Sequence, residues 1–377
     1  MKYFEKFVSN TYAGSSNQLY FTLPSGVVKT GRVFYKISVG GEYNYSLLFS
    51  NIIDSTHSVG AVSHKNMICD EWHIHKARIG RCKDIPSGKP MSELTMSDGD
   101  GQTDITVFDL RDISFDGEVE KRVAPGEFFS SDPVLMYFDK GDYLCLELSF
   151  SGGMIPYHEE SLLPIYVMEN GKWVYSKCMP LAGMVGCDRK VKARIGFWGD
   201  SITQGIGTAL NSYKHWNAVL SEKLGDGFSY WNLGIGYGRA NDGASLGAWY
   251  YKIKQNDIIV VCFGVNDIFR GFTEEGIKAD LLKIVETLKK DGKTVILQAI
   301  PPYGYTDEKR PMWERINEFI KSELGEKADL VFDVSPFIGR EDMPSEAKYG
   351  GHPNEEGCRI WAEALYSEIA PMLKKIH

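Results

Sequence analysis

Four short segments of the carboxyl-terminal half contain residues that can do chemistry. They are FWGDSITQG around Ser201, WNLGIGYGR around Gly236, CFGVNDI around Asn266 and GHPNEEG around His352. A serine hydroxyl beside a histidine can act as a nucleophile, and backbone N–H groups or an asparagine amide can stabilise an oxyanion. Whether these groups act together depends on the elements that carry them.

Each segment taken alone also has an ordinary structural explanation. Ser201 could cap a helix, and the glycines could let a helix pack closely on a sheet. Asn266 could form an Asx turn or a cap, and a single histidine such as His352 is more often a satisfied surface residue. The case for a catalytic site therefore depends on all four segments meeting at one place.

The segments lie where predicted strands end. After the polar stretch 186–193 the sequence alternates between strand-like and helical runs, and residues 274–292 form an amphipathic helix with one apolar face. This alternation predicts an open, five-stranded parallel sheet covered by helices, with the functional residues in loops at the carboxyl ends of the strands. The strand-like runs are ARIGFWG, FSYWNLG, DIIVVCFG, KTVILQAI and DLVFDVS.

The amino-terminal half has a different pattern. From residue 19 to about 180, short β-like runs alternate with Gly, Pro, Asp and Ser. In GDYLCLELSFSG, Leu144, Leu146, Leu148 and Phe150 alternate onto one face, as in a half-buried antiparallel strand. We therefore expect an all-β sandwich domain over residues 1–188 and an α/β domain over residues 189–377.

Composition excludes several classes of partner. The formal net charge of −8 and the lack of a basic stripe argue against nucleic acid. No apolar run is long enough for a membrane span, and the amino terminus lacks the pattern of a signal peptide. The seven cysteines show no CxxC spacing, which favours reduced, mostly buried thiols. If the sequence begins at the native start, these features predict a cytoplasmic protein.

Two further segments could have functional roles. His73 and His75 in EWHIHK share one face of a strand and could begin a metal site, but no third ligand follows at a suitable spacing, so a structural role is favoured and no metal is expected. The run PPYGYTDEKRPMW, residues 301–313, could form the wall or lid of a cleft, or a rigid connection.

The four blocks GDSITQG, NLGIGYG, GVND and HPNEEG, in this order, resemble the SGNH (GDSL-like) hydrolase family over residues 193–372. The resemblance implies a flavodoxin-like hydrolase domain without a cofactor. It also implies that Ser201 is the nucleophile, that Asn266 donates its amide to the oxyanion and that His352 is the general base.

The chain departs from the family pattern at two positions. The glycine expected five residues after Asn232 is replaced by Tyr237, so the backbone donor could be Gly236, Tyr237 or Gly238, with Gly236 slightly preferred. Tyr349 also stands where family members carry the aspartate that orients the histidine. A tyrosine does not supply that charge near neutral pH.

Three explanations of Tyr349 remain open at the level of sequence. A backbone carbonyl could orient His352, which would leave a Ser-His dyad. A substitute acid, Glu346 or Asp342, could take the place of the aspartate. Alternatively, activity could be weak or lost. We favour a dyad or a substitute acid over inactivity, because the other parts of the apparatus are present.

The amino-terminal sandwich resembles, less specifically, the jelly-roll domain of some two-domain carbohydrate esterases. Together these resemblances imply a metal-free serine esterase that removes small acyl groups, acetyl foremost, from a carbohydrate or polyol through an acyl-enzyme. Its partners would be small-molecule or oligosaccharide esters, and its oligomeric state stays open. The alternatives are a lysophospholipase or thioesterase, or a catalytically degenerate ligand-binding protein.

Overall fold

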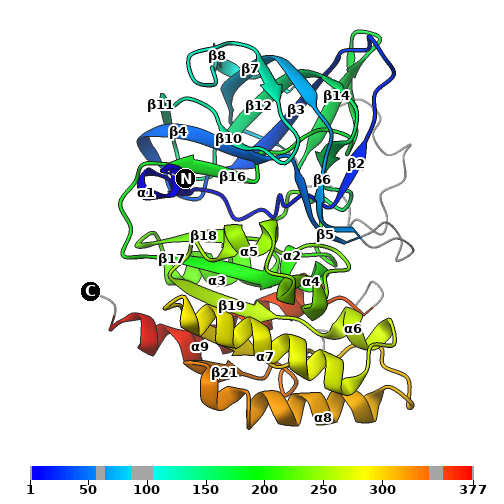
Figure 1. Cartoon of the computed structure of the whole chain (residues 1–377). Helices are drawn as coiled ribbons and strands as arrows, with labels where there is room; N and C mark the ends of the chain where they lie inside the picture. Colours follow the sequence, from blue (N-terminus) through cyan, green and yellow to red (C-terminus); the bar gives the residue numbers. More distant parts are fainter. Residues whose placement is uncertain (1, 57–63, 86–104, 339–350, 376–377) are drawn as a thin grey trace. The chain divides into compact units, whose positions relative to one another are not determined.

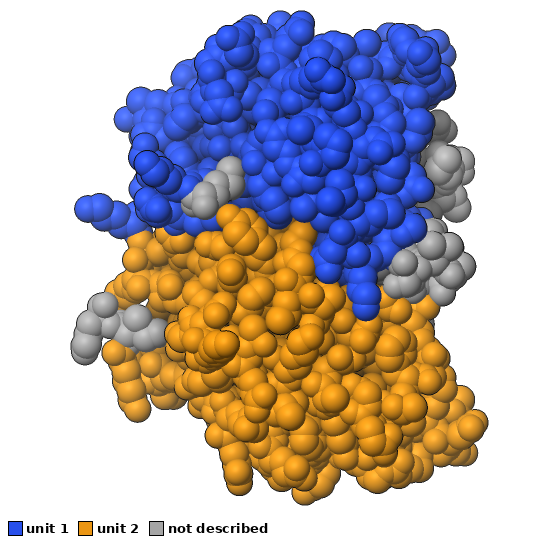
Figure 2. All heavy atoms as spheres, viewed as in Figure 1, with its two compact units in different colours: residues 1–190 blue, residues 191–377 orange. Residues whose placement is uncertain are grey.

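The computed structural model describes residues 2–56, 64–85, 105–338 and 351–375. The chain divides into two compact units, Met1–Lys190 and Val191–His377, which are coloured separately in Figure 2. Glu346, Asp342 and Tyr349 lie outside the described residues. Each unit is described by itself below.

The amino-terminal unit is built from antiparallel strands (Figure 1). One sheet has the order β1-β16-β4-β10, with β11 also paired to β4, and the other has the order β15-β14-β3-β12-β7-β8, with β9 also paired to β7. The short pairs β13-β2 and β5-β6 complete it. This arrangement agrees with the predicted β sandwich. Its elements are α1 Tyr3–Lys6, β1 Val8–Ser9, β2 Leu19–Phe21, β3 Lys29–Lys36, β4 Gly41–Ser50, β5 Ile52–Thr56, β6 His64–Ile68, β7 Trp72–Cys82, β8 Phe108–Asp112, β9 Lys121–Val123, β10 Phe128–Ser130, β11 Val134–Phe138, β12 Tyr143–Gly152, β13 Ile155–Tyr157, β14 Ile165–Glu169, β15 Lys172–Tyr175 and β16 Met184–Cys187.

Strand β12 has the predicted apolar face, but it is buried on both faces rather than half-buried. Leu144, Leu146, Leu148 and Phe150 are all fully buried. On the opposite face, the Glu147 carboxylate accepts hydrogen bonds from Arg32 on β3 and Arg78 on β7. The strand therefore contributes apolar side chains to the core on one face and an ion-paired carboxylate on the other.

The carboxyl-terminal unit contains the predicted five-stranded sheet, in the order β18-β17-β19-β20-β21. Every neighbouring pair is parallel. In chain order this is 2-1-3-4-5, the flavodoxin-like arrangement. Its elements are β17 Ala193–Gly199, α2 Ser201–Gln204, α3 Trp216–Leu224, β18 Phe228–Asn232, α4 Ala240–Ala244, α5 Ala248–Ile253, β19 Ile258–Cys262, α6 Val265–Phe269, α7 Glu274–Lys290, β20 Thr294–Gln298, α8 Arg310–Lys321, the 3₁₀ turn η3 Gly325–Lys327, β21 Leu330–Phe332 and α9 Glu355–Leu373.

Helices flank this sheet in two packed groups (Figure 1). Helix α3 packs against α9, and helix α7 packs against both α4 and α8. Helix α7 has the predicted apolar face, because Ile277, Leu281, Ile284, Val285 and Leu288 are all buried. Thr273 caps its first turn by accepting a hydrogen bond from the N–H of Gly276.

The strand register places three loops beside one another. Phe197 pairs with Asn232, and Gly199 pairs with Cys262, so β17, β18 and β19 end at the same edge of the sheet. The loops that leave these ends contain Ser201, Gly236 and Asn266. This edge is where ligands bind in open parallel sheets.

Candidate active site

Ser201 is the first residue of the short helix α2 and directly follows the central strand β17. The preceding residue, Asp200, is the cap, and its carboxylate accepts a hydrogen bond from the N–H of Ile202. The capping role that the sequence left open for Ser201 thus belongs to Asp200. The half-buried Ser201 hydroxyl is available for another partner.

That partner is His352. The Ser201 Oγ and the His352 Nε2 lie 2.7 Å apart, although 151 positions separate the two residues in the chain. His352 stands just before helix α9, whose first turn is capped by the Asn354 side chain. The distance is that of a direct hydrogen bond, so a proton can pass between the two atoms.

The loop that follows α2 fits closely against the histidine segment. Gly207 has a φ of +104°, and a Cβ at this position would lie against the carbonyl oxygen of Pro353 and 3.1 Å from the Cβ of His352. A larger residue would therefore push the histidine segment away from Ser201. The close contact depends on glycine at this position.

The other ring nitrogen of His352 faces Tyr303. The Tyr303 hydroxyl lies 3.3 Å from the His352 Nδ1, and the two rings meet edge to face with centroids 5.5 Å apart. The sequence alone does not predict Tyr303 as a partner of the histidine. Its only signal is its place in the aromatic run 301–313, which predicts a cleft wall, a lid or a connection.

The glycine block forms a tight turn after β18. The N–H of Gly238 donates to the carbonyl of Ile235 at 3.1 Å, and Tyr237 takes a left-handed conformation with φ of 61°. The N–H of Gly238 is therefore already used within the turn. Of the three backbone groups that the sequence left open, this bond excludes Gly238 as the donor and does not choose between Gly236 and Tyr237.

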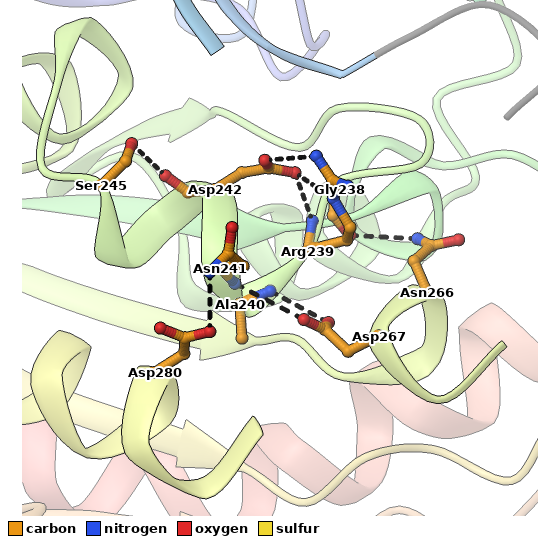
Figure 3. Close-up of polar contacts among 9 residues, drawn as sticks. All are labelled: Gly238, Arg239, Ala240, Asn241, Asp242, Ser245, Asn266, Asp267 and Asp280. Atoms are coloured by element: carbon orange, nitrogen blue, oxygen red, sulfur yellow. Dashed lines mark hydrogen bonds and ion pairs between the residues drawn. The ribbon is translucent and has the colours of Figure 1, made fainter. Parts of the chain in front are cut away.

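Asn266 joins this turn to the next loop. It lies in α6, and its Nδ2 donates to the carbonyl of Gly238 at 3.0 Å (Figure 3). A side-chain amide has two N–H groups, and the second has no partner among the described residues. It is therefore available to an oxyanion, as is the Ser201 N–H at the start of α2, which also lacks a partner in the described part of the chain.

Two buried carboxylates hold the surrounding loops. Asp267 accepts hydrogen bonds from the backbone N–H groups of Ala240 and Asn241, at 3.0 and 3.4 Å, and so fixes the start of α4 beside α6 (Figure 3). Burial raises the pKa of Asp267 to about 7. Burial likewise raises the pKa of Asp200 to about 7, and the charge of Asp267 adds to this shift.

A buried ion pair reinforces the same region. The Arg239 guanidinium, at the cap of α4, contacts both carboxylate oxygens of Asp242 (Figure 3). Both side chains are almost completely buried. The pair is hydrogen-bonded as well as oppositely charged, so it stabilises the start of α4, which follows the glycine turn directly.

The two histidines singled out in the amino-terminal unit have local partners. His75 Nε2 lies 2.7 Å from the Ser151 hydroxyl, and His73 Nε2 lies 3.9 Å from the Glu120 carboxylate. Among the described ranges, no group of three or more His, Cys, Asp or Glu side chains is arranged to hold a metal ion. In the same ranges, no helix has the length and apolar character needed to cross a membrane.

The arrangement at the sheet edge is suited to acyl transfer. It combines a hydroxyl that can be deprotonated with a histidine that can receive the proton, and the Ser201 N–H and the second Asn266 amide N–H belong to loops at the same edge of the sheet. The sequence-predicted Ser201, Gly236, Asn266 and His352 all lie in loops or helix starts at this edge, with the direct Ser201–His352 contact at its centre.

Comparisons with known proteins gave one family match and a set of similar folds. Residues 197–360 match the model of the GDSL-like Lipase/Acylhydrolase family. No curated protein gave a significant match.

Three solved structures illustrate the fold similarity. A member of the lipolytic protein G-D-S-L family from Veillonella parvula is 20% identical, with 48% of this chain and 98% of that chain covered and a TM-score of 0.41. The esterase EstA from Pseudoalteromonas sp. is 17% identical, with 48% and 99% covered and a TM-score of 0.40. A variant of the acetyl xylan esterase Axe2 from Geobacillus stearothermophilus is 22% identical, with 48% and 95% covered and a TM-score of 0.40.

The family match includes Ser201, Gly236, Asn266 and His352. It therefore spans all four segments from which the site was built. Residues 197–360 are therefore similar to the GDSL-like Lipase/Acylhydrolase family over the whole site.

Proposed function

We propose that the protein is a serine esterase that removes small acyl groups, acetyl foremost, from a carbohydrate or similar polyol. The observation that carries this proposal is the 2.7 Å contact between the Ser201 hydroxyl and His352 Nε2. A ligand-binding protein would not require this contact, whereas a nucleophilic mechanism does.

The reaction follows from the placement of these groups. Ser201 Oγ bonds to the ester carbonyl carbon as its proton passes to His352 Nε2. The oxyanion receives hydrogen bonds from the Ser201 N–H, the Asn266 amide and the Gly236 region. When the bond to the alcohol breaks, His352 gives the proton to the leaving oxygen. A water molecule then repeats the sequence on the acyl-enzyme and releases the acid.

A sugar or polyol as the alcohol is supported by the aromatic side chains beside the base. Tyr303 contacts His352, and Phe269, which is 37% exposed, packs against Tyr303 with ring centroids 5.2 Å apart. Aromatic rings that are partly accessible bind the apolar faces of sugar rings well, because they bury area while polar groups around them fix orientation.

The first experiment compares wild type with Ser201→Ala. We expect the wild type to release acetate from p-nitrophenyl acetate and from acetylated oligosaccharides, and Ser201→Ala to lose at least about a thousandfold in kcat, since the acyl-enzyme cannot form. Ser245→Ala is the matched control, because its hydroxyl donates to the carbonyl of Asp242 at the end of α4.

Esters with acyl chains of increasing length distinguish an acetylesterase from a lysophospholipase or thioesterase. Faster turnover of long-chain p-nitrophenyl esters or thioesters than of acetyl esters would replace the acetylesterase proposal with a lysophospholipase or thioesterase. Absence of labelling by a serine-reactive phosphonate, together with no hydrolysis of any ester, would overturn the enzyme proposal in favour of a ligand-binding protein.

A further inference from the structure

Tyr303 occupies the place at which a histidine base needs a partner. The Tyr303 hydroxyl lies 3.3 Å from His352 Nδ1, on the ring edge opposite the nitrogen that faces Ser201. A group at Nδ1 decides which ring nitrogen carries the proton and how the ring is oriented. The distance of 3.3 Å between the Tyr303 hydroxyl and Nδ1 is long for a hydrogen bond, but a small movement of either ring would shorten it to an ordinary one.

An aromatic cluster fixes the position of Tyr303. Phe269 meets Tyr303 edge to face and stacks on Tyr305, with centroids 5.5 Å apart in the second case. Tyr305 is buried and stacks on Trp313, whose Nε1 donates to the carbonyl of Ile300. Because these rings pack against one another, the Tyr303 ring has little freedom to move, and its hydroxyl keeps one position.

The histidine segment is shaped to accept this ring. Gly351 precedes His352 with a φ of +90°, and a Cβ at this position would lie 2.8 Å from three atoms of the Tyr303 ring. Only glycine combines that conformation with so close an approach. The ring of Tyr303 therefore lies directly against the backbone that carries the base.

We propose that Tyr303 is the positioning residue of His352. Its phenolic oxygen accepts the Nδ1–H, which keeps Nε2 unprotonated and directed at the Ser201 hydroxyl. When Ser201 gives its proton to Nε2, Nδ1 keeps its own proton, and the tyrosine oxygen supports the resulting imidazolium. This inference rests on the proposed function, because it gives the site the orienting group that Tyr349 does not supply as a carboxylate.

The nature of the partner has a measurable consequence. A neutral phenol stabilises an imidazolium less than a carboxylate does, but more than no acceptor at all. Removal of the hydroxyl should therefore lower the pKa of His352 and let its neutral ring populate both tautomers. A purely structural tyrosine would not change either property.

The test compares Tyr303→Phe, which keeps the ring and removes the oxygen, with Tyr305→Phe. Tyr305 belongs to the same cluster, but its hydroxyl bonds to the carbonyl of Pro301. We expect Tyr303→Phe to lower kcat by at least about tenfold with KM little changed, and to move the acidic limb of the kcat/KM profile to lower pH. Tyr305→Phe should do neither.

Nitrogen NMR of the histidine rings tests the same inference without turnover. With the His352 signal assigned by a His352→Gln variant, we expect the wild type to carry the proton on Nδ1 and Tyr303→Phe to show a mixture of tautomers. Unchanged kinetics and an unchanged tautomer in folded Tyr303→Phe would overturn the positioning role. If no ester is hydrolysed but the tautomer still responds, the proposed function fails and the Tyr303 contact stands.

Discussion

Asn266 has two tasks that its single side chain can perform at once. One amide N–H donates to the carbonyl of Gly238 at 3.0 Å and so fixes the glycine turn. The second amide N–H is available to donate to the oxygen of a reacting ester. An aspartate of the same shape could do neither, because a carboxylate does not donate. The position of the Asn266 side chain and that of the glycine turn are therefore coupled through this bond.

This coupling predicts a large kinetic effect of Asn266→Ala. We expect kcat to fall about 100- to 1,000-fold, because one oxyanion donor is lost and the turn that contains Gly236 is loosened. KM for p-nitrophenyl acetate should change little, since the lost interactions strengthen only in the transition state. Steady-state kinetics on a purified, folded variant provide the measurement.

Asn241→Ala is the matched control for this prediction. Its side chain donates to Asp280 and lies on the neighbouring helix α4 (Figure 3). It should retain turnover within a few fold. If Asn266→Ala were as active as Asn241→Ala, the side chain of Asn266 would have no role in stabilising the oxyanion.

The residues of the site differ in how far the sequence could predict them. Ser201 and His352 could be paired because each stands in a recognisable block at a strand end. Tyr303 could not, because its role depends on the path of a loop rich in proline and aromatic residues. The choice among residues 236–238 narrowed only when the bond from Gly238 to Ile235 was visible.

Among the elements, β20 leads to Tyr303 and α9 follows His352, so the packing of these two elements positions the pair. Trp361 of α9 is fully buried, and its Nε1 donates to Gln298 at the end of β20. The same ring stacks on Trp216 of α3, with centroids 5.3 Å apart. Since His352 precedes α9 and Tyr303 follows β20, the Trp361 contact fixes the elements that position His352 and Tyr303.

The start of α9 should therefore affect both stability and activity. Asn354→Ala removes the side-chain bond to the N–H of Gly357 and should cost about 1 kcal/mol of stability. Asn354 is only two positions after His352, so fraying of the first turn of α9 would also loosen the histidine, and we expect kcat to fall several fold. Thermal unfolding and p-nitrophenyl acetate kinetics measure the two effects.

Thr273→Ala removes the equivalent cap from α7 and serves as the control. It should lower the melting temperature by a similar amount but leave kcat unchanged, since α7 contributes no residue to the site. Equal kinetics in the two variants would show that the fixed start of α9 does not contribute to positioning the histidine.

The elements themselves were largely predictable, because their periodicity reflects burial. The apolar faces of β12 and α7 appear in the structure as the sequence predicts, although the opposite face of β12 is buried as well. Tight turns were less predictable. Tyr237 takes a left-handed conformation that sequence preference assigns to glycine, and the tertiary bond from Asn266 to Gly238 supports that turn.

At the scale of the whole molecule, the buried carboxylates make stability depend on pH. Burial raises the pKa of Asp267 from an ordinary value of 3.8 to about 7. Well below pH 3.8 the carboxyl is protonated in both the folded and the unfolded chain, and its contribution to stability is complete. As the pH rises toward 7, the Asp267 carboxyl ionises in the unfolded chain before it ionises in the folded protein. The free energy of unfolding therefore falls progressively over this range.

Asp267→Asn should remove the part of this dependence that Asp267 contributes, while Asp200 continues to titrate. An asparagine mimics the protonated acid and can still accept the N–H of Ala240 through its oxygen. Between pH 4 and 7 we expect the free energy of unfolding of the wild type to fall by roughly 2–4 kcal/mol relative to that of Asp267→Asn. Urea unfolding at several pH values within this range measures the difference.

Asn317→Ala provides the comparison, because it removes a buried polar side chain that does not titrate. Asn317 accepts the N–H of Ile300 and donates to its carbonyl, so its loss should destabilise the protein by a similar amount at every pH. A wild-type curve parallel to that of Asp267→Asn would mean that the carboxylate is ionised in the folded state throughout the range. The two backbone N–H groups at the start of α4 would then stabilise its charge more strongly than burial opposes it.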